Sequence, residues 1–384
     1  MARDSQQPRK LRVGFDARWY NDSGVGAYVR GLLGAMVQLE DELDLIVYEN
    51  PRNLVPLPDC SNVQRVALRA KKYSVAEQVE LARRSSEDRL NVFHSPFYVV
   101  PLFTRCPVVV TVHDLIPFLF PIYSRAKQAI VRAGYRMAVR KAAQIIADSD
   151  NTARDLQQIL QVSIDKVSTV HLAPSEVYQP KTDPGEFDLL QQKYGISQPY
   201  VLLASARNWR TKSLDTALRV LKAVREAGAK FQTVVYGSPE GMEACNADES
   251  VLSPEMKYIG YVAADELAIL YRHAGVFLFP SLYEGFGLPV LEAMACGCAV
   301  VASNAGALAE VVGSGGQVFD PHDVRGMADA VRELLGGPAK QKHWREAAYR
   351  RSADFSWTEA ARETLRVYHQ THKSSLFSRV AHKS

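Results

Sequence analysis

Short apolar segments with the length of buried strands alternate along this chain with longer segments of helical character. Such alternation is typical of a doubly wound parallel sheet, whose strands are covered by helices on both faces. In the first half, strands are expected at Leu11–Phe15, Leu43–Tyr48, Asn91–His94, Pro107–Val112, Gln144–Ala147 and Lys166–His171. In the second half, they are expected at Tyr200–Ser205, Thr233–Tyr236, Tyr258–Gly260, Val276–Pro280, Ala299–Ala302 and Gly316–Phe319. The sequence therefore predicts the α/β class, with two Rossmann-like parallel-sheet domains that face a central cleft.

The chain is long enough for two hydrophobic cores. Its 384 residues favour two domains of roughly 150 to 200 residues each. The stretch Ala173–Gln198 is polar and contains Pro174, Pro180, Pro184 and Gly185, which is typical of a linker with a short helix. We predict an N-terminal domain over 1–175, a linker region over 176–198 and a second domain over 199–356. A C-terminal helix that opens at Trp357, followed by a mobile basic tail from Thr371 to Ser384, completes the chain over 357–384.

Composition excludes several classes of protein. Hydrophobic residues make up 47% and charged residues 23% of the chain, an ordinary globular mixture. The net charge of +4 is mild for this size, and no basic groove with interleaved aromatic residues is visible, so nucleic acid is not an expected partner. The cysteines are odd in number and scattered, which suggests neither a disulfide framework nor a zinc site: Cys60, Cys106, Cys245, Cys296 and Cys298. The N-terminal segment is polar, and no apolar run reaches the roughly 18 residues of a membrane span, so we expect a cytoplasmic protein.

The segment Phe279–Pro321 carries the strongest indication of function. It reads FPSLYEGFGLPVLEAMACGCAVVASNAGALAEVVGSGGQVFDP and combines an apolar strand, a glycine-rich turn, a short helix and a second apolar strand. Pro289 suits the first turn of that helix, and Gly285 and Gly287 allow a ligand to approach the backbone. Glu284 and Glu292 stand eight residues apart around this turn, and carboxylates accept hydrogen bonds from sugar hydroxyls. An anionic, hydroxyl-rich ligand such as a sugar nucleotide fits this pattern; the alternative is a surface loop and a solvated helix face.

A second glycine-containing turn follows the first expected strand. In FDARWYNDSGVGAYVRGL, Gly24 and Gly26 allow close backbone approach to a ligand at the start of a helix. The pattern lacks the third glycine and the spaced acid of a dehydrogenase-type dinucleotide site. A plain strand–helix turn is the alternative. Asp16, at the end of the strand, is a weaker candidate on the acceptor side.

Two histidines end neighbouring strands of the first domain. His113 and Asp114 terminate the apolar strand in VVVTVHDLIPFLFP, where an imidazole would face the cleft. A structural role is the alternative for His113. His94, in FHSPF, ends the neighbouring strand. We expect Asp114 and His94 on the acceptor side, although a buried structural role for His94 is equally consistent with its position.

A basic loop follows the first strand of the second domain. In SARNWRTKSLDTAL, Arg207 and Lys212 are suited to a pyrophosphate, the arginine as a fork and the lysine as a point charge. The alternative is a solvated basic loop, of which Arg210 is an example.

With its flanks, EGFGLPVLEAMACG followed by AVVASNAGALAEVVG resembles the donor-site signature of the family 4 retaining glycosyltransferases of the GT-B fold. The segment HDLIP resembles a motif that is common in the mannosyltransferase-like branch of that family. The resemblance implies that Glu284 contacts the transferred sugar and that Glu292 holds the nucleotide ribose. It further implies that the backbone of the following residues meets sugar and phosphate: Gly285, Phe286, Gly287 and Leu288.

The same resemblance assigns roles to the other motifs. Gly24 and Gly26 would lie under the donor phosphates, and His113 would contact the transferred sugar. Lys212 matches the family's lysine, and Arg207 matches its arginine with one residue of slack. Both cations would stabilise the charge that develops on the leaving pyrophosphate, so neither a metal nor another cofactor is expected. The resemblance implies retention of configuration by front-face attack, and a last helix that crosses back to the N-terminal domain.

The acceptor side carries an unusual charge pattern. From Leu115 to Ala147 there is no acidic residue, and four arginines fall on one helical face at spacings of 7, 4 and 4: Arg125, Arg132, Arg136 and Arg140. Next to the apolar stretch Pro117–Ile122, this face suits a lipid pyrophosphate at an anionic membrane surface. A solvated helix face is the alternative.

Three hypotheses follow. The first is transfer of a hexose, mannose from GDP-mannose, to a lipid-linked or glycan acceptor in the biosynthesis of a surface polysaccharide such as lipopolysaccharide. The second is a transferase that uses a UDP- or ADP-linked sugar on a small soluble acceptor, or a phosphorolytic enzyme of the same fold. The third is a catalytically silent GT-B scaffold that binds glycans, against which the intact set of His113, Lys212, Glu284 and Glu292 argues.

Overall fold

A computed structural model describes residues 10–22, 24–39, 42–206, 209–240 and 256–381. The chain divides into two compact units. Unit 1 contains the chain through Asp148, then Thr152–His171 and the segment from Trp357 onward. Unit 2 contains Ser149–Asn151 and Leu172–Ser356.

Unit 1 is built on a seven-stranded sheet in which every pairing is parallel. Its strand order is β3-β2-β1-β4-β5-β6-β7, so the chain starts in the middle of the sheet and winds toward both edges. The strands are β1 (Leu11–Asp16), β2 (Leu43–Glu49), β3 (Val63–Ala67), β4 (Val92–Ser95), β5 (Val108–Val112), β6 (Gln144–Ala147) and β7 (Val167–Thr169). The central strands are buried along their whole length, as the apolar runs predict.

The sequence did not predict β3. This strand lies at the edge of the sheet, and only Val66 of its five residues is buried. Edge strands are exposed on one side and lack the continuous apolar run of central strands, so their sequence signal is weak.

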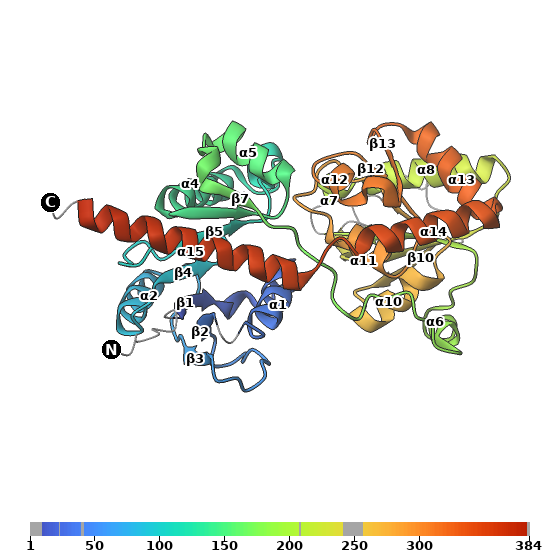
Figure 1. Ribbon diagram of the computed structural model, residues 1–384. Coiled ribbons are helices and arrows are strands. Elements are labelled where there is room, and N and C mark those ends of the chain that lie inside the picture. The colour runs from blue at the N-terminus through green and yellow to red at the C-terminus, as the bar shows by residue number, and fades with distance from the viewer. Residues whose placement is uncertain (1–9, 23, 40–41, 207–208, 241–255, 382–384) are drawn as a thin grey trace, which may run out of the picture. The chain divides into compact units, whose positions relative to one another are not determined.

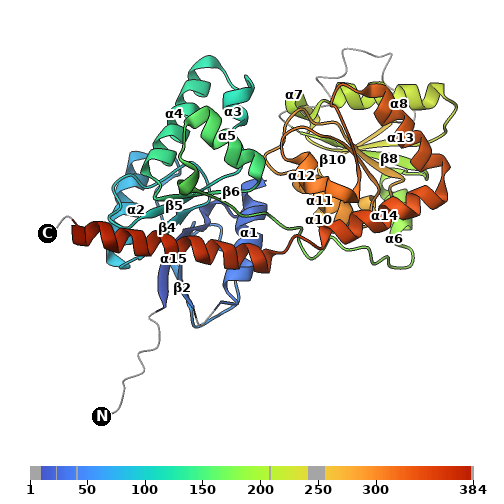
Figure 2. The same cartoon turned by 45° about the horizontal axis from the view of Figure 1, so that its top comes forward.

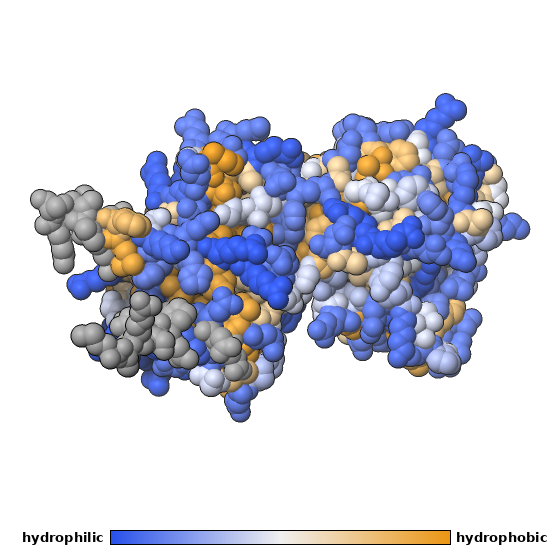
Figure 3. Space-filling view, in the orientation of Figure 1, coloured by the Kyte–Doolittle hydropathy of each residue, from blue (hydrophilic) through white to orange (hydrophobic). Residues whose placement is uncertain are grey.

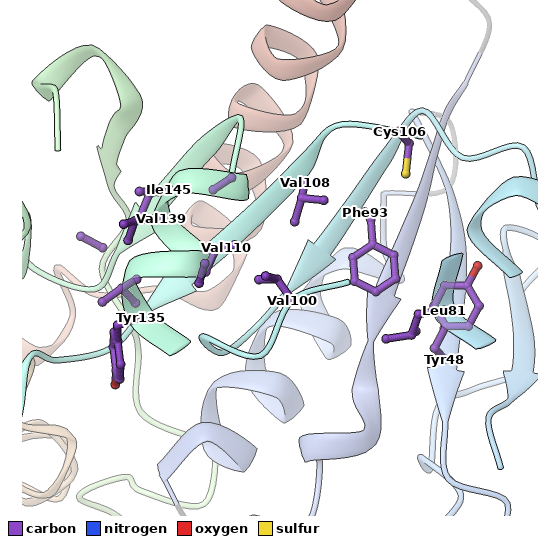
Figure 4. Close-up of a cluster of buried hydrophobic side chains, with 14 of the residues drawn as sticks. Tyr48, Leu81, Phe93, Val100, Cys106, Val108, Val110, Tyr135, Val139 and Ile145 are labelled. Carbon is purple, nitrogen blue, oxygen red and sulfur yellow. The ribbon is translucent and has the colours of Figure 1, made fainter. Parts of the chain in front are cut away.

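The helices of unit 1 enclose this sheet (Figures 1 and 2). They are η1 (Ala17–Trp19), α1 (Gly24–Met36), α2 (Val75–Glu87), α3 (Ile116–Leu119), α4 (Arg125–Lys141), α5 (Asp150–Leu160), η2 (Ile164–Lys166) and α15 (Trp357–Ala381). One core cluster joins side chains of the sheet, such as Phe93 and Val110, to Leu81 of α2 and Tyr135 of α4 (Figure 4).

The last helix, α15, packs beside α1, although the two helices lie near opposite ends of the sequence (Figures 1 and 2). A Cβ added at Gly31 of α1 would lie 2.0 Å from the ring of Trp357, so only glycine leaves room for that indole. Figure 3 shows hydrophilic side chains along the outer surface of α15. The predicted mobile tail from Thr371 is wrong at its start, because α15 continues to Ala381 and the Thr371 side chain is buried.

Unit 2 is built on a six-stranded sheet that is also parallel throughout, with the order β10-β9-β8-β11-β12-β13. Its strands are β8 (Tyr200–Ser205), β9 (Gln232–Gly237), β10 (Met256–Gly260), β11 (Val276–Phe279), β12 (Val300–Ser303) and β13 (Gln317–Phe319). Its helices are α6 (Glu186–Tyr194), α7 (Trp209–Lys212), α8 (Leu214–Glu226), α10 (Ala264–His273), α11 (Leu288–Ala295), α12 (Leu308–Val312), η3 (Gly313–Gly315), α13 (Val324–Gly336) and α14 (Pro338–Ser352). The two parallel sheets confirm the predicted fold class.

The segment 176–198, expected as a linker region, lies within unit 2. Leu190 of α6 and Ile196 are fully buried in its core. Glu186, the first residue of α6, is paired with Arg272 and His273 of α10. These contacts hold the segment against the domain, which its polar composition did not reveal.

Two further findings bear on the class of protein. Among the described residues, no helix combines the length and the apolar character that a membrane crossing requires. The cysteines at 60, 106, 296 and 298 form no disulfide among the described residues, and Cys245 lies outside them.

Candidate functional site

Glu284 lies in the turn between β11 and α11, at the carboxyl end of the unit 2 sheet. Its side chain is largely buried and accepts a hydrogen bond from Ser281 Oγ at 2.5 Å. Ser281 Oγ also lies 2.7 Å from the Thr211 carbonyl, and Leu282 N donates to the same carbonyl at 2.6 Å. The β11 turn is thus joined to the α7 segment, although the two are about seventy residues apart in the sequence.

Lys212, the last residue of α7, forms an ion pair with Glu284. The Nζ–Oε1 distance is 2.6 Å, and the side chains are 17% and 12% exposed, so the pair is only partly accessible to solvent. The ammonium also lies 4.7 Å from the centre of the Phe279 ring. An ammonium has three donors, and within the described chain only the carboxylate of Glu284 hydrogen-bonds to it. The remaining N–H groups of Lys212 can bind an anionic ligand beside the carboxylate.

Two glycines fix the backbone around this pair. Gly306 has a φ of +60°, and a Cβ there would lie 2.3 Å from the carbonyl oxygen of Glu284. The same carbonyl accepts a hydrogen bond from Ala307 N at 2.9 Å. Gly287, with a φ of +106°, is the N-cap of α11, and a Cβ there would lie 2.7 Å from Leu308. Glycine is required at both positions by conformation and by space.

Glu292 lies one turn inside α11 and faces a group of tyrosines. Burial first, and then the Glu292 carboxylate, raise the pKa of Tyr178. Burial also raises the pKa of Tyr236, and the negative charges of Glu292 and Glu284 raise that pKa further. The negative charges of both predicted carboxylates therefore act on the same tyrosine of β9. The shared donor site of the two glutamates stays a prediction.

Three other predicted donor-site residues, Gly285, Phe286 and Leu288, lie in the same turn or at the start of α11. Phe286 is 4% exposed and packs edge-on against Phe355, so its side chain belongs to the core and only its backbone is available to a ligand. Gly285 and Leu288 flank it between Glu284 and the first turn of α11. Arg207 lies outside the described residues, and its role stays a prediction.

In unit 1, His113 is held at the carboxyl end of the sheet. Val112 pairs with Ala147, so the next residues of the two strands, His113 and Asp148, emerge side by side. His113 Nδ1 lies 2.6 Å from Asp148 Oδ2, and Nε2 lies 2.8 Å from the Pro96 carbonyl oxygen.

Both ring nitrogens of His113 thus face acceptors, an arrangement that favours the doubly protonated ring. Burial acts to lower the pKa of His113, but the charge and hydrogen bond of Asp148 and the Pro96 carbonyl raise it above its ordinary value. Neither nitrogen is free in this conformation. The predicted contact of His113 with the transferred sugar stays a prediction.

The two glycines of the turn after β1 differ in the space around them. A Cβ at Gly26 would lie 2.5 Å from the Tyr20 carbonyl oxygen, so the protein itself requires this glycine. A Cβ at Gly24 would meet no described atom within 4 Å. Gly24 begins α1, where helix amides and the helix dipole favour an anion. The alternative of a plain strand–helix turn therefore explains the glycine at position 26. The predicted contact of Gly24 with a ligand stays a prediction.

The acceptor-side assignments of Asp16 and His94 need correction, because both side chains are buried. Asp16 is 1% exposed, and its two oxygens bind Arg18, each at 2.7 Å. His94 is fully buried, lies 2.5 Å from the Tyr368 hydroxyl of α15 and 2.8 Å from Thr111 Oγ1. A buried charge is stable only when it is paired, and a buried polar group only when it is hydrogen-bonded. Both residues therefore hold the fold together, which for His94 was one of the two expectations.

Asp114 lies two residues before the start of α3. Its Oδ1 accepts a hydrogen bond from Ile116 N at 2.9 Å, as in an Asx turn. No group of His, Cys, Asp and Glu side chains suited to a metal ion occurs within the described part of the chain.

Known proteins resemble this chain over both units. A family model described as Glycosyltransferase Family 4 matches residues 23–173, and one described as Glycosyl transferases group 1 matches residues 186–351. O-antigen chain mannosyltransferase B of Escherichia coli is 31% identical over 300 residues, which are 72% of this chain and 74% of that protein. Serotype-specific mannosyltransferase WbdA of Escherichia coli is 29% identical over 241 residues, which are 61% of this chain but 30% of that protein.

Among solved structures, sucrose-phosphate synthase from Thermosynechococcus elongatus has a TM-score of 0.75 at 18% identity, over 95% of this chain and 100% of that one. Two Rossmann-like parallel-sheet units with this likeness define the GT-B fold. Together with the family models and the 31% identical relative, the site places the protein more narrowly. The chain belongs to glycosyltransferase family 4.

Sequence reasoning missed several residues that shape the site. Asp148 directly follows an expected strand, so the strand-end rule that selected His113 also selects it. Ser281 and Gly306 give weaker signals, because a serine after a strand and a glycine in a loop are common. Tyr178 came from the segment interpreted as a linker, and no pattern in the sequence connects it to Glu292.

Proposed function

We propose that this protein is a retaining mannosyltransferase, which transfers mannose from GDP-mannose to a lipid-linked or glycan acceptor during assembly of a cell-surface polysaccharide. The observation that carries the proposal is the Lys212–Glu284 pair, fixed by Ser281 and Gly306 at the strand ends beside the start of α11. The choice of mannose is supported by relatives whose names state that they are mannosyltransferases.

In this proposal a cation and a carboxylate act on different parts of one donor. Glu284 accepts hydrogen bonds from hydroxyl groups of the mannosyl residue, and Glu292 from those of the ribose. The bond between the anomeric carbon and the diphosphate breaks as the acceptor oxygen bonds to that carbon from the same face. The leaving diphosphate gains negative charge, which Lys212 and the first amides of α11 stabilise, and it takes up the acceptor's proton. Arg207 is expected to add a second cation.

Contact with Glu284 limits how far Lys212 moves before the donor arrives. The ion pair holds the ammonium at 2.6 Å from the carboxylate that is to bind the sugar. A cation positioned in advance loses little conformational freedom when it binds the diphosphate. The predicted catalytic and donor-binding roles of these two residues are therefore geometrically compatible.

A donor screen tests this proposal. We expect saturation-transfer NMR and a product assay on the purified protein to show binding and turnover of GDP-mannose, with weaker signals from UDP- and ADP-linked sugars. Preferred binding of a UDP- or ADP-sugar would replace the mannosyl proposal by the alternative donor. Donor binding without any transfer or hydrolysis would favour the silent scaffold.

A matched pair of variants tests the site. Glu284→Gln removes the charge next to Lys212 and should lower kcat by roughly a hundredfold or more, because the residue contacts the reacting sugar. Glu333→Gln removes an acid from the exposed ion pair with Lys340, and turnover should be unchanged. Near-normal turnover of Glu284→Gln would refute the site assignment.

Peripheral association with an anionic membrane is a further part of the proposal. Three of the four predicted arginines, Arg125, Arg136 and Arg140, are exposed on α4. Among the described residues none of the three has an ion-pair partner. Arg132 differs, because it is half-buried and donates to the Pro117 carbonyl at 2.7 Å, which ties α4 to α3.

Vesicle sedimentation at low salt tests this association. We expect the protein to bind vesicles that contain phosphatidylglycerol and to be released as salt rises. Arg136→Glu should weaken binding severalfold, whereas Arg325→Glu, at an exposed position of α13, should not. If the wild-type protein does not bind such vesicles at low salt, this part of the proposal is wrong.

A further inference from the structure

An open apolar cavity lies on the surface of unit 1 between α2 and α4, and we name it the α2–α4 groove. Its volume is about 680 Å³, within the roughly 300–1,000 Å³ range of ligand pockets. Apolar side chains from α2, from the loop after β4 and from α4 line it: Val75, Val100, Leu102, Ile130 and Met137. Tyr73, Tyr98 and Tyr123 complete its walls.

Several of these side chains are exposed although they are large and apolar. Val75 is 82% exposed, Ile130 73% and Met137 48%. Burial of an apolar side chain is favourable because it removes apolar surface from water, and these exposed side chains do not gain that stabilisation. A group of them around one cavity is typical of a binding site and not of a plain surface.

Three polar side chains of the groove, Gln78, Ser74 and Glu77, are hydrogen-bonded within the protein. The Gln78 amide donates to the Val100 carbonyl at 3.0 Å and accepts from Leu102 N at 2.7 Å. Ser74 Oγ donates to the Lys71 carbonyl and accepts from Glu77 N. Glu77, the only acid of the lining, binds Arg18 and Tyr73 N. A ligand in this groove meets hydrocarbon and ring surfaces, and few groups that would recognise a peptide backbone or a sugar.

Cations lie at the aromatic walls of the groove. Lys127 Nζ is 4.4 Å from the centre of the Tyr123 ring, and Lys127 lines the groove itself. Lys72 Nζ is 4.0 Å from the Trp19 ring, which in turn lies edge-on to Tyr73 at 5.8 Å, but Lys72 is already paired with Asp22 at 2.9 Å. Within the described chain, Lys127 has no acidic partner. An anionic group at the edge of the groove would therefore be attracted and not repelled.

A row of aromatic rings links the groove to the strand-end site. The Tyr98 ring, in the groove wall, lies 4.3 Å from Phe97. Phe97 lies 4.7 Å from Trp19 and 6.4 Å from the ring of His113. Phe97 thus lies between the wall of the groove and the ring of His113.

We propose that the α2–α4 groove binds the hydrocarbon chain of a lipid-linked acceptor, with its phosphate beside Lys127. The lipid-linked nature of the acceptor belongs to the proposed function, on which this inference rests. Charge and chemistry both favour that occupant: a cavity lined mostly by hydrocarbon and ring surfaces for the chain, and a cation without an acidic partner among the described residues for the phosphate.

The test uses the full-length protein and farnesyl phosphate as the probe, with farnesol and inorganic phosphate as matched compounds. Isothermal titration calorimetry should show farnesyl phosphate to bind more tightly than either one. Ile130→Glu places a carboxylate in the groove and should raise the Kd of farnesyl phosphate by roughly tenfold or more. Met137→Glu should act in the same direction, and Leu54→Glu, 61% exposed and outside the groove, should leave the Kd unchanged.

A second variant separates the chain from the phosphate. Lys127→Met should reduce the affinity for farnesyl phosphate to about that for farnesol, and leave farnesol binding unchanged. Thermal unfolding of each variant shows whether the fold is intact. Because Ile130, Met137 and Lys127 are exposed at the surface, we expect all of these variants to fold.

A measurement of donor binding distinguishes a failure of this inference from a failure of the proposed function. GDP-mannose should bind all the groove variants as it binds the wild-type protein. Farnesyl phosphate binding that Ile130→Glu abolishes supports the groove even if GDP-mannose does not bind, in which case the proposed function fails alone. No binding of farnesyl phosphate, or binding that Ile130→Glu and Met137→Glu leave unchanged, overturns the inference. Loss of vesicle binding in Ile130→Glu without any binding of farnesyl phosphate also overturns it, in favour of a membrane surface.

Discussion

Replacing Gly306 by alanine should move Glu284 and test whether its position controls turnover. The new Cβ would lie 2.3 Å from the Glu284 carbonyl oxygen, whereas real Cβ contacts stay beyond 3.0 Å. The two atoms must separate by at least about 0.7 Å (3.0 − 2.3), and a misplacement of about 1 Å can cost 10²-fold in rate. We therefore expect kcat for mannosyl transfer to fall roughly tenfold to a hundredfold.

The same substitution should also destabilise unit 2. The left-handed φ of +60° costs an alanine about 1–2 kcal/mol, and the collision adds about 1–3 kcal/mol of overpacking. The loss of unfolding free energy should be about 2–5 kcal/mol.

Gly228→Ala provides the matched control for backbone strain. Gly228 has a φ of +90°, and its added Cβ would meet no described atom within 4 Å. We expect this variant to lose about 1–2 kcal/mol and to keep full turnover. Steady-state kinetics and thermal unfolding of both variants decide the question. If Gly306→Ala stays within threefold of wild-type turnover, or if Gly228→Ala loses as much activity, the argument from the contact with Glu284 is wrong.

The other predictions concern unit 1. Gly31→Ala should lower the free energy of unfolding, because about 1–3 kcal/mol of overpacking against the α15 tryptophan exceeds the roughly 1 kcal/mol gain in helix propensity. Gly34→Ala, in the same helix and without a neighbour within 4 Å, should raise it by about 0.5–1 kcal/mol; if the denaturant midpoints of the two variants shift in the same direction, one of these two predictions is wrong. The raised pKa of His113 adds stability that is complete below its unfolded value of about 6.5 and is lost as pH rises through the folded pKa, so Asp148→Asn should abolish this dependence in pH-resolved unfolding experiments. Burial lowers the pKa of His94 to about 3, so stability should fall as pH drops below about 6.5, and His94→Gln should lose this acid-side slope; an unchanged slope would show that His94 does not titrate as described.

Most of the fold could be predicted from the sequence because its strands are buried on both faces. The strand Val108–Val112, for example, is a buried and mostly apolar run that is bounded by polar segments on either side. The exceptions depend on tertiary contacts. β3 is stabilised by pairing with β2 although most of its residues are exposed, and Thr371 lies inside a helix because that helix packs on unit 1.

The candidate site could be predicted in part. The strand-end rule placed Glu284 and His113 correctly at the carboxyl edges of the two sheets, but it did not show that both nitrogens of His113 are already hydrogen-bonded. It also selected Asp16 and His94, whose side chains turn into the protein. A strand-end position says where the backbone leaves the sheet, and only packing decides whether the last side chain meets solvent or core.

The geometry of the Lys212–Glu284 pair follows from strand order and not from local sequence. The lysine follows β8 and the glutamate follows β11, and these two strands are direct neighbours in the sheet. β12 lies on the other side of β11, which brings Gly306, after β12, against the Glu284 backbone. A chain with the same motif but another strand order would place the three residues apart. The motif EGFGLP therefore indicates a site only together with the order β8-β11-β12, because that order brings the cation to the carboxylate.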